Sequence, residues 1–203
     1  MVDTVRYLSD ASNSSEDKAH NVRALLSSAP SKVLDFGSGN GQFATALRKI
    51  YPETTIVMTD LPEQGPHNGL DYESVNADST LRFEDNSFDV VVAMMVLHHV
   101  VDIETTCKEI FRVLRPGGKL VVREHDFSVN QDFSHHRTLR HIMDYLDVVH
   151  DSFNDEMPVI RYYSARTLAL IFEGVGLDLK TLQLYPDHIQ NPQHVYHSLY
   201  ERF

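Results

Sequence analysis

The sequence has little cysteine, no long apolar run and a shortage of cationic side chains. Cys107 is the only cysteine among 203 residues, which excludes an intrachain disulfide and a zinc site built from cysteines. No apolar stretch reaches the length of a membrane span, and the N-terminus lacks the basic-then-apolar pattern of a secretion signal. We therefore expect a cytoplasmic protein, although a nuclear one is also compatible, without membrane association.

Cationic side chains number 18, against 29 Asp and Glu, which gives a formal net charge of −11. Because phosphate contacts need clustered Lys and Arg, broad nucleic-acid binding is not expected. The charge balance suits a neutral or cationic substrate better, although net charge bears on solubility first. The length suits one α/β domain over residues 1–203, and no repeat, low-complexity tract or linker divides it.

The central stretch runs from Lys32 to Phe43 and predicts a strand, a turn and the start of a helix. Residues 32–36 are mostly large and apolar, as in a strand covered on both faces. Glycines follow at every second position, and a helical pattern resumes at residues 42–50. In an open α/β sheet, ligands bind beyond the carboxyl ends of the strands, where this turn lies.

The turn differs from the dinucleotide fingerprint G-x-G-x-x-G. Here the pattern is D-x-G-x-G-x-G from Asp35 to Gly41, with the third glycine one residue early. An acid at this point repels a pyrophosphate and attracts a cation. The spacing therefore argues against an NAD-linked oxidoreductase.

Six further strands are predicted along the chain. The fourth strand, Val90–Met95, is a continuous apolar run typical of a central parallel strand. The last two strands alternate and are expected to pair in antiparallel fashion. The predicted ranges are Thr54–Thr59, Ser74–Asp78, Val90–Met95, Lys119–Arg123, Leu177–Tyr185 and His194–Phe203. Helices are predicted at Asp102–Leu114, with Cys107 in the core, at Asp132–His150 and at Ala165–Glu173 with Ser164 as N-cap.

Five segments, in order, resemble the class I S-adenosylmethionine-dependent methyltransferases, and within them a type 11-like domain. They are the glycine turn, Asp60 after the second strand, Asp78-Ser79, the phrase from Phe88 to Val100 around His98-His99, and the Pro116-Gly117-Gly118 turn. The resemblance covers residues 33–203. It implies a Rossmann-like seven-stranded sheet of order 3-2-1-4-5-7-6, with strand 7 antiparallel and helices on both faces. It also implies S-adenosyl-L-methionine as the cofactor.

The resemblance implies a set of cofactor-binding residues. Asp60 would hold the ribose hydroxyls, and Asp78 with Ser79 would reach the adenine amino group. The alternatives are that Asp60 forms a turn before Leu61-Pro62 and that Asp78 forms an Asx turn. The full set is Asp35, Phe36, Gly37, Ser38, Gly39, Gly41, Asp60, Leu61, Asp78, Ser79, Met94 and Met95.

Ionisable residues at the ends of the fourth and fifth strands are candidates for the acceptor side. Glu124, His125 and Asp126 follow the fifth strand, and the period of two predicts that Glu124 and Asp126 point one way and His125 the other. Either this cluster and His98 face the methyl acceptor as proton acceptors, or the acids cap a helix and the histidines fill polar pockets.

Two segments flank this domain core. Residues 1–30 are predicted as an N-terminal helical segment, with Ser15 as a plausible N-cap and an apolar face at Val22, Leu25 and Leu26. Residues 127–163 are predicted as an acceptor-side lid with a histidine-rich helix face. That face lacks the His-x₃-His spacing of a zinc site, so no metal is expected.

We predict methyl transfer to an oxygen or nitrogen nucleophile on a small molecule. The lysine set of RNA cap ribose methyltransferases and the Asn/Asp-Pro-Pro-aromatic signature of nucleobase amino methyltransferases are both absent. The alternatives are an RNA or protein methyltransferase, and a catalytically silent cofactor-binding partner subunit. Neither the acceptor nor the oligomeric state follows from the residues.

Overall fold

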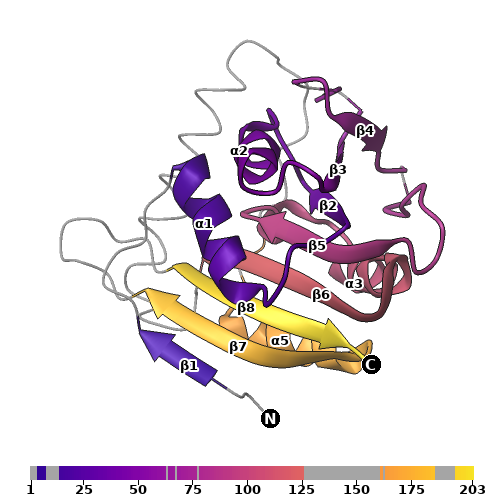
Figure 1. Ribbon diagram of the computed structural model, residues 1–203. Helices are drawn as coiled ribbons and strands as arrows, with labels where there is room; N and C mark the ends of the chain where they lie inside the picture. Colours follow the sequence, from indigo (N-terminus) through magenta and orange to yellow (C-terminus); the bar gives the residue numbers. More distant parts are fainter. Residues whose placement is uncertain are drawn as a thin grey trace, which may run out of the picture.

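A computed structural model describes residues 4–7, 14–62, 64–66, 68–76, 78–125, 161, 163–185 and 195–203. In these ranges the chain forms one eight-stranded sheet with helices on both faces (Figure 1). The strands are β1 Thr4–Tyr7, β2 Lys32–Phe36, β3 Thr55–Asp60, β4 Asp71–Ser74, β5 Phe88–Met94, β6 Leu114–His125, β7 Leu177–Tyr185 and β8 Val195–Arg202. The helices are α1 Ser15–Leu25, α2 Gln42–Ile50, the 3-10 turn η1 Leu97–His99, α3 Ile103–Val113 and α5 Ala165–Gly174.

The strand order is β1-β7-β8-β6-β5-β2-β3-β4. Strand β8 runs antiparallel to both β6 and β7, and the other pairs are parallel. Without β1, this is the predicted order 3-2-1-4-5-7-6 with an antiparallel strand 7, which is confirmed. Strand β1 adds an edge strand beyond β7, inside the segment that the sequence predicted only as helical.

The two central strands lie where their apolar character predicts. Strand β2 pairs with β3 on one side and β5 on the other, so Asp35 lies opposite both Met58 and Val92. Nearly all residues of β2 and β5 are buried. Because every parallel strand ends at the same edge, the residues that follow β2, β3, β5 and β6 meet there.

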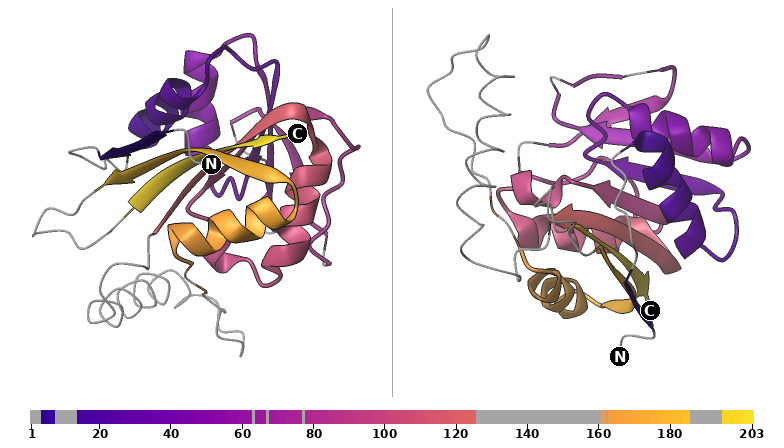
Figure 2. Two further views of the ribbon diagram at one scale, coloured as in Figure 1. Left: turned by 90° about the horizontal axis from the view of Figure 1, so that it is seen from below. Right: turned by 90° about the vertical axis from the view of Figure 1, so that its left-hand side faces the viewer.

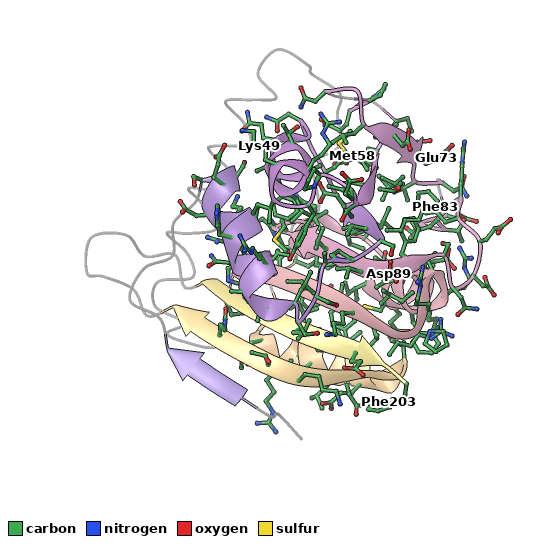
Figure 3. All side chains as sticks on the ribbon, viewed as in Figure 1. Lys49, Met58, Glu73, Phe83, Asp89 and Phe203 are labelled. Atoms are coloured by element: carbon green, nitrogen blue, oxygen red, sulfur yellow. The ribbon has the colours of Figure 1, made fainter. Side chains whose placement is uncertain are left out.

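The helices divide the core into two layers (Figure 2). Helices α1 and α2 cover one face, and their buried Ala19, Val22 and Phe43 pack with Met58 of β3, which lies between α2 and the sheet in Figure 3. Helices α3 and α5 cover the other face and contribute Cys107 and Phe172, among others. The sheet is therefore buried on both sides, as parallel sheets require.

Several local boundaries differ from the predictions. The fifth strand, predicted at Lys119–Arg123, is β6, Leu114–His125, and includes the predicted turn at Pro116-Gly117-Gly118. The third strand was predicted at Ser74–Asp78 but is β4, Asp71–Ser74. The chain leaves the sheet after Val75, because the Asn76 amide donates to Thr80 O at 3.0 Å and closes a turn. The N-cap of α1 is Ser14 instead of Ser15, since the Ser14 side chain accepts from the Asp17 amide.

Two other expectations about the helices are confirmed. Ser164 caps α5, accepting from the Thr167 amide. Cys107 is fully buried on α3, and burial raises the pKa of its thiol to about 12. A thiol so hard to ionise is a core residue and not a nucleophile.

Candidate functional site

The glycine turn packs tightly on one side and is open on the other. The Gly37 and Ser38 amides donate to Thr59 O at 2.8 and 3.2 Å, which ties the turn to β3. Gly37 has φ +73, and a Cβ there would meet Val96 Cγ2 at 2.1 Å. Gly39 has φ +50, and a Cβ there would meet nothing within 4 Å. The turn thus rests on Val96 beyond β5 and leaves space beside Gly39 for a ligand.

Asp60 bridges the end of β3 and the glycine turn. Its Oδ2 accepts from the Gly39 amide at 2.6 Å, and its Oδ1 accepts from the Leu61 amide at 2.7 Å. Each carboxylate oxygen keeps a second lone pair, so ribose hydroxyls can still donate to this group. Leu61 follows with a side chain that is 60% exposed.

Asp35 is a buried carboxyl at the end of β2. It is 1% exposed, and its Oδ2 has no hydrogen-bond partner in the described part of the chain. Burial, with the charge of Asp60 adding to it, raises the pKa of Asp35 to about 8. A cation placed beside this carboxyl would relieve both effects. The ammonium of S-adenosylmethionine is such a cation, and the buried Ser38 Oγ, also without a described partner, is a second polar atom of the same turn.

Asp78 and Ser79 lie in the turn after β4. Asp78 is exposed, and its Oδ1 accepts from the Thr80 amide at 3.1 Å and from Thr80 Oγ1 at 2.6 Å. These bonds lower the pKa of Asp78. This is the Asx turn that the sequence left open as an alternative. It leaves Oδ2 of the exposed carboxylate for an adenine contact, a role that stays a prediction.

The remaining predicted cofactor residues surround the end of β5 and the turn. Met94 is buried with the α1–α2 layer, and Met95 is half-buried with φ +62, a costly conformation for a residue with a side chain. The Met95 amide donates to Arg123 O at 2.8 Å, which holds it at the edge of the sheet. Phe36 and Gly41 are buried. Since Phe36 belongs to the core on the α3–α5 side, only its backbone lies at the turn.

His98 and Glu124 form a buried pair. His98 Nδ1 lies 2.7 Å from Glu124 Oε2, and the side chains are 2% and 3% exposed. Glu124 Oε1 accepts from the Leu97 amide at 2.7 Å. Strand β6 supplies the acid and η1 the histidine, so the pair joins the ends of β5 and β6. The sequence placed both residues on the acceptor side but gave no sign that they contact each other.

Several predicted residues lie outside the described ranges. Asp126, the segment 127–160 with its predicted helix, and Tyr162 are among them. His125 ends β6, but its side chain is not described, so the predicted alternation of Glu124, His125 and Asp126 stays a prediction. Conversely, Val96 and Arg123 contact the turn and the β5 end without having been predicted. A cation directly after the apolar run of residues 120–122 was the one available signal for Arg123.

The described ranges contain neither a membrane-spanning helix nor a cluster of metal-binding side chains. No helix there is long and apolar enough to cross a membrane. No group of three or more His, Cys, Asp or Glu side chains there is placed to hold a metal ion.

The chain is similar to known proteins over most of its length. A family described as methyltransferase domain matches residues 10–182. The chain is 35% identical over 106 residues to the ubiquinone/menaquinone biosynthesis C-methyltransferase UbiE of Haemophilus ducreyi, covering 46% of this chain and 40% of that protein. It is 32% identical over 112 residues to the demethylmenaquinone methyltransferase of Thermus thermophilus, covering 51% of each. The chain thus spans about half or less of the length of these relatives.

Solved structures share the fold at lower identity. An S-adenosylmethionine-dependent methyltransferase of Thermotoga maritima, described as a possible histamine N-methyltransferase, superposes with a TM-score of 0.68 at 18% identity. It covers 94% of this chain and 90% of that one. At 18% identity the structural match shows the fold alone. The family match shows that the chain has a methyltransferase domain. The chain belongs to the S-adenosylmethionine-dependent methyltransferases with the class I Rossmann-like fold.

Proposed function

We propose that this enzyme methylates an oxygen or nitrogen nucleophile on a small molecule, with His98 as proton acceptor and Glu124 as its positioning residue. The observation that carries the proposal is the 2.7 Å contact between His98 Nδ1 and Glu124 Oε2, buried at the carboxyl end of the sheet. Burying a carboxylate and an imidazole at this edge costs free energy unless they bond to each other or to a ligand.

Glu124 fixes the tautomer and the direction of the imidazole. Its Oε1 is held by the Leu97 amide, so Oε2 is left to accept the Nδ1 proton of His98. With the proton on Nδ1, Nε2 becomes the basic nitrogen of the ring. Such an imidazole takes a proton from a hydroxyl as its oxygen attacks, or from an ammonium before its nitrogen attacks, and the carboxylate stabilises the imidazolium that forms.

The cofactor side is formed by the turn and the two acids. Asp35 and Ser38 would contact the amino-acid end, Asp60 the ribose and exposed Leu61 one face of the adenine. When bound, S-adenosylmethionine supplies an electrophilic methyl group on its sulfonium. The residues of the chain contribute mainly position, since holding two reactants in line removes much of the entropic barrier.

Two features favour a small acceptor. The relatives matched here carry names that refer to quinone biosynthesis, which concerns small molecules. The net charge of −11 opposes long contacts with nucleic acid. Because the UbiE relative is named a C-methyltransferase, carbon methylation of an acidic ring is the second candidate. The same base would remove a proton from that ring, and the position of the new methyl group in the product distinguishes the two.

The test measures turnover and cofactor affinity in three single variants. His98→Asn and Glu124→Gln are compared with His99→Asn, the exposed neighbour whose ring centroid lies 4.2 Å from that of His98. A panel of phenols, amines and quinols serves as acceptors, and formation of S-adenosylhomocysteine is followed. We expect kcat to fall about 100-fold or more for His98→Asn. The kcat of Glu124→Gln should fall less than that of His98→Asn, and the kcat of His99→Asn should equal that of the unchanged enzyme.

Binding of S-adenosylhomocysteine should stay within about threefold in all three variants. Wild-type kcat in folded His98→Asn would contradict the role of the base. Failure of the unchanged protein to turn over any acceptor, despite binding the cofactor, would favour the silent-subunit alternative. Methylation of RNA or protein, but of no small molecule in the panel, would favour the alternative of an RNA or protein methyltransferase.

A further inference from the structure

The hydroxyl of Tyr72 reaches the segment of chain that carries Asp60. Tyr72 belongs to β4, whereas Asp60 ends β3 and Leu61 follows it. The two strands are parallel neighbours at one end of the sheet (Figure 1). Tyr72 Oη donates to Leu61 O at 2.6 Å and lies 3.2 Å from Asp60 O. The hydroxyl has a single proton, so Leu61 O is its main acceptor and Asp60 O shares it.

The register of the two strands places Tyr72 and Asp60 on the same face. Tyr72 lies opposite Met58, and Asp60 lies opposite Ser74. Residues two apart on a strand point to the same face, which here is the face that α2 covers. The ring of Tyr72 is half-buried and packs against the core cluster that contains Met58 and Leu70. The core therefore fixes the ring, and the ring fixes the position of the hydroxyl.

The carbonyls of Asp60 and Leu61 also have backbone partners. Asp60 O accepts from the Val75 amide at 3.0 Å, and Leu61 O accepts from the Gln64 amide at 3.0 Å. These bonds remain possible whatever side chains are present. The bond from Tyr72 belongs to a side chain, so Tyr72→Phe removes it while the packed ring stays in place. The contribution of this bond can therefore be measured separately.

The hydroxyl can act on the Asp60 carboxylate through the backbone. Asp60 O and the Leu61 N–H belong to one planar peptide unit, so a contact at the oxygen also fixes the direction of the N–H. That N–H donates to Asp60 Oδ1 at 2.7 Å. Asp60 Oδ2 in turn accepts from the Gly39 amide at 2.6 Å. The carboxylate is thus held between the glycine turn and a peptide unit that Tyr72 supports from behind.

We propose that Tyr72 is a positioning residue for the cofactor, which keeps the Asp60 carboxylate directed at the ribose hydroxyls. A carboxylate held in place before binding loses less entropy when the ribose arrives, and this raises the affinity. The inference rests on the part of the proposed function that assigns the ribose to Asp60. It adds a residue of β4 to a site whose other predicted members follow β2, β3 and β5 or lie in the turn after β4.

The binding test compares two ligands that differ only in the ribose. S-adenosylhomocysteine and its analogue without the 2′ and 3′ hydroxyls are each titrated by calorimetry into the unchanged protein and into Tyr72→Phe. Affinity for S-adenosylhomocysteine should fall roughly two- to tenfold in the variant, the scale of one neutral hydrogen bond. Affinity for the analogue should be the same in both proteins, because it offers Asp60 no hydroxyl.

Two further variants serve as controls. Tyr51→Phe removes the hydroxyl of another half-buried tyrosine, at the C-terminal end of α2, whose ring packs against the same core cluster. It should bind both ligands like the unchanged protein. In the background of Asp60→Ala, adding Tyr72→Phe should cost no further affinity, because both changes then act on the same missing contact. Urea unfolding of each variant shows that the protein titrated is folded.

Equal affinity of the unchanged protein and Tyr72→Phe for S-adenosylhomocysteine would overturn the inference. So would an equal loss of affinity for the analogue, because the hydroxyl would then serve the adenine side or the fold instead of the ribose. If Asp60→Ala alone leaves the affinity unchanged, the ribose role of Asp60 in the proposed function is wrong. The roles of His98 and Glu124 do not depend on any of these results, since turnover and not cofactor binding tests them.

Discussion

The Asp60 carboxylate and the Gly39 amide are joined by a 2.6 Å hydrogen bond between Oδ2 and N. The bond connects the end of β3 with the tip of the glycine turn. It therefore places the acid beside the open space at Gly39 before any ligand arrives. A site arranged in advance loses less entropy when it binds.

Removing this acid should weaken cofactor binding. Asp60→Ala deletes charged hydrogen bonds worth about 1–3 kcal/mol, so affinity for S-adenosylhomocysteine should fall roughly 5- to 150-fold. Isothermal titration calorimetry measures this, with Asp71→Ala, an exposed acid at the start of β4, as the control. Unchanged affinity in a folded Asp60→Ala protein would place the ribose elsewhere.

The two glycines should respond differently to the same added methyl group. In Gly37→Ala the new Cβ meets Val96 at 2.1 Å in a left-handed backbone, so stability should fall by about 2–4 kcal/mol. In Gly39→Ala only the backbone strain remains, about 1 kcal/mol, while cofactor affinity falls because the methyl group fills the open space.

Urea unfolding and calorimetric titration together separate these two effects. The double variant Gly37→Ala/Val96→Ala should recover part of the lost stability, since the clash is with the Val96 side chain. Equal losses of stability in both single variants would show that the turn does not pack as described.

Asp35 should make stability depend on pH. Its pKa is about 8 in the fold, against 3.8 as the reference value. Between those values the native state holds a proton that the unfolded chain has released. The contribution is thus fully present below about pH 4 and is lost as pH rises toward 8. Asp35→Asn should flatten the profile of unfolding free energy over this range.

The same group should link cofactor binding to proton release. An ammonium beside Asp35 favours the carboxylate, so at pH 6.5 about one proton should leave per cofactor bound. Calorimetry in two buffers of different ionisation enthalpy counts that proton, and Asp35→Asn should release none. A count of zero in the unchanged protein would mean that Asp35 does not meet the ammonium.

Arg112 should matter for stability and not for the site. It bonds the Glu109 and Asp85 carboxylates and the carbonyls of Leu81 and Phe83, which fastens the 81–88 turn to α3. The side chain is 29% exposed, so solvent weakens these bonds. Arg112→Ala should lower stability by about 2 kcal/mol without changing cofactor affinity. Arg48→Ala, which loses one 3.3 Å contact, is the control in the same unfolding assay.

The sequence by itself determined the positions of the central strands and of the turn, whereas the strand order was implied by the family resemblance. Continuous apolar runs such as residues 90–94 predict buried parallel strands, and spaced glycines predict the sharp turn between them. Such patterns are local, so they can be recognised without the rest of the chain. The family resemblance then grouped Asp35, Asp60 and the two glycines as one predicted site, and the structure places Asp60 in contact with Gly39.

Only the tertiary structure decided which side chains meet. Glu124 and His98 are 26 residues apart, and Arg123 meets His197 across an antiparallel pair that no local pattern fixes. The contact of Gly37 with Val96 likewise depends on two strands lying side by side. Strand β1 was missed because an edge strand forms by pairing with β7, which lies far away in the sequence. Packing between distant segments sets these contacts, whereas local periodicity reports only which face of an element is buried.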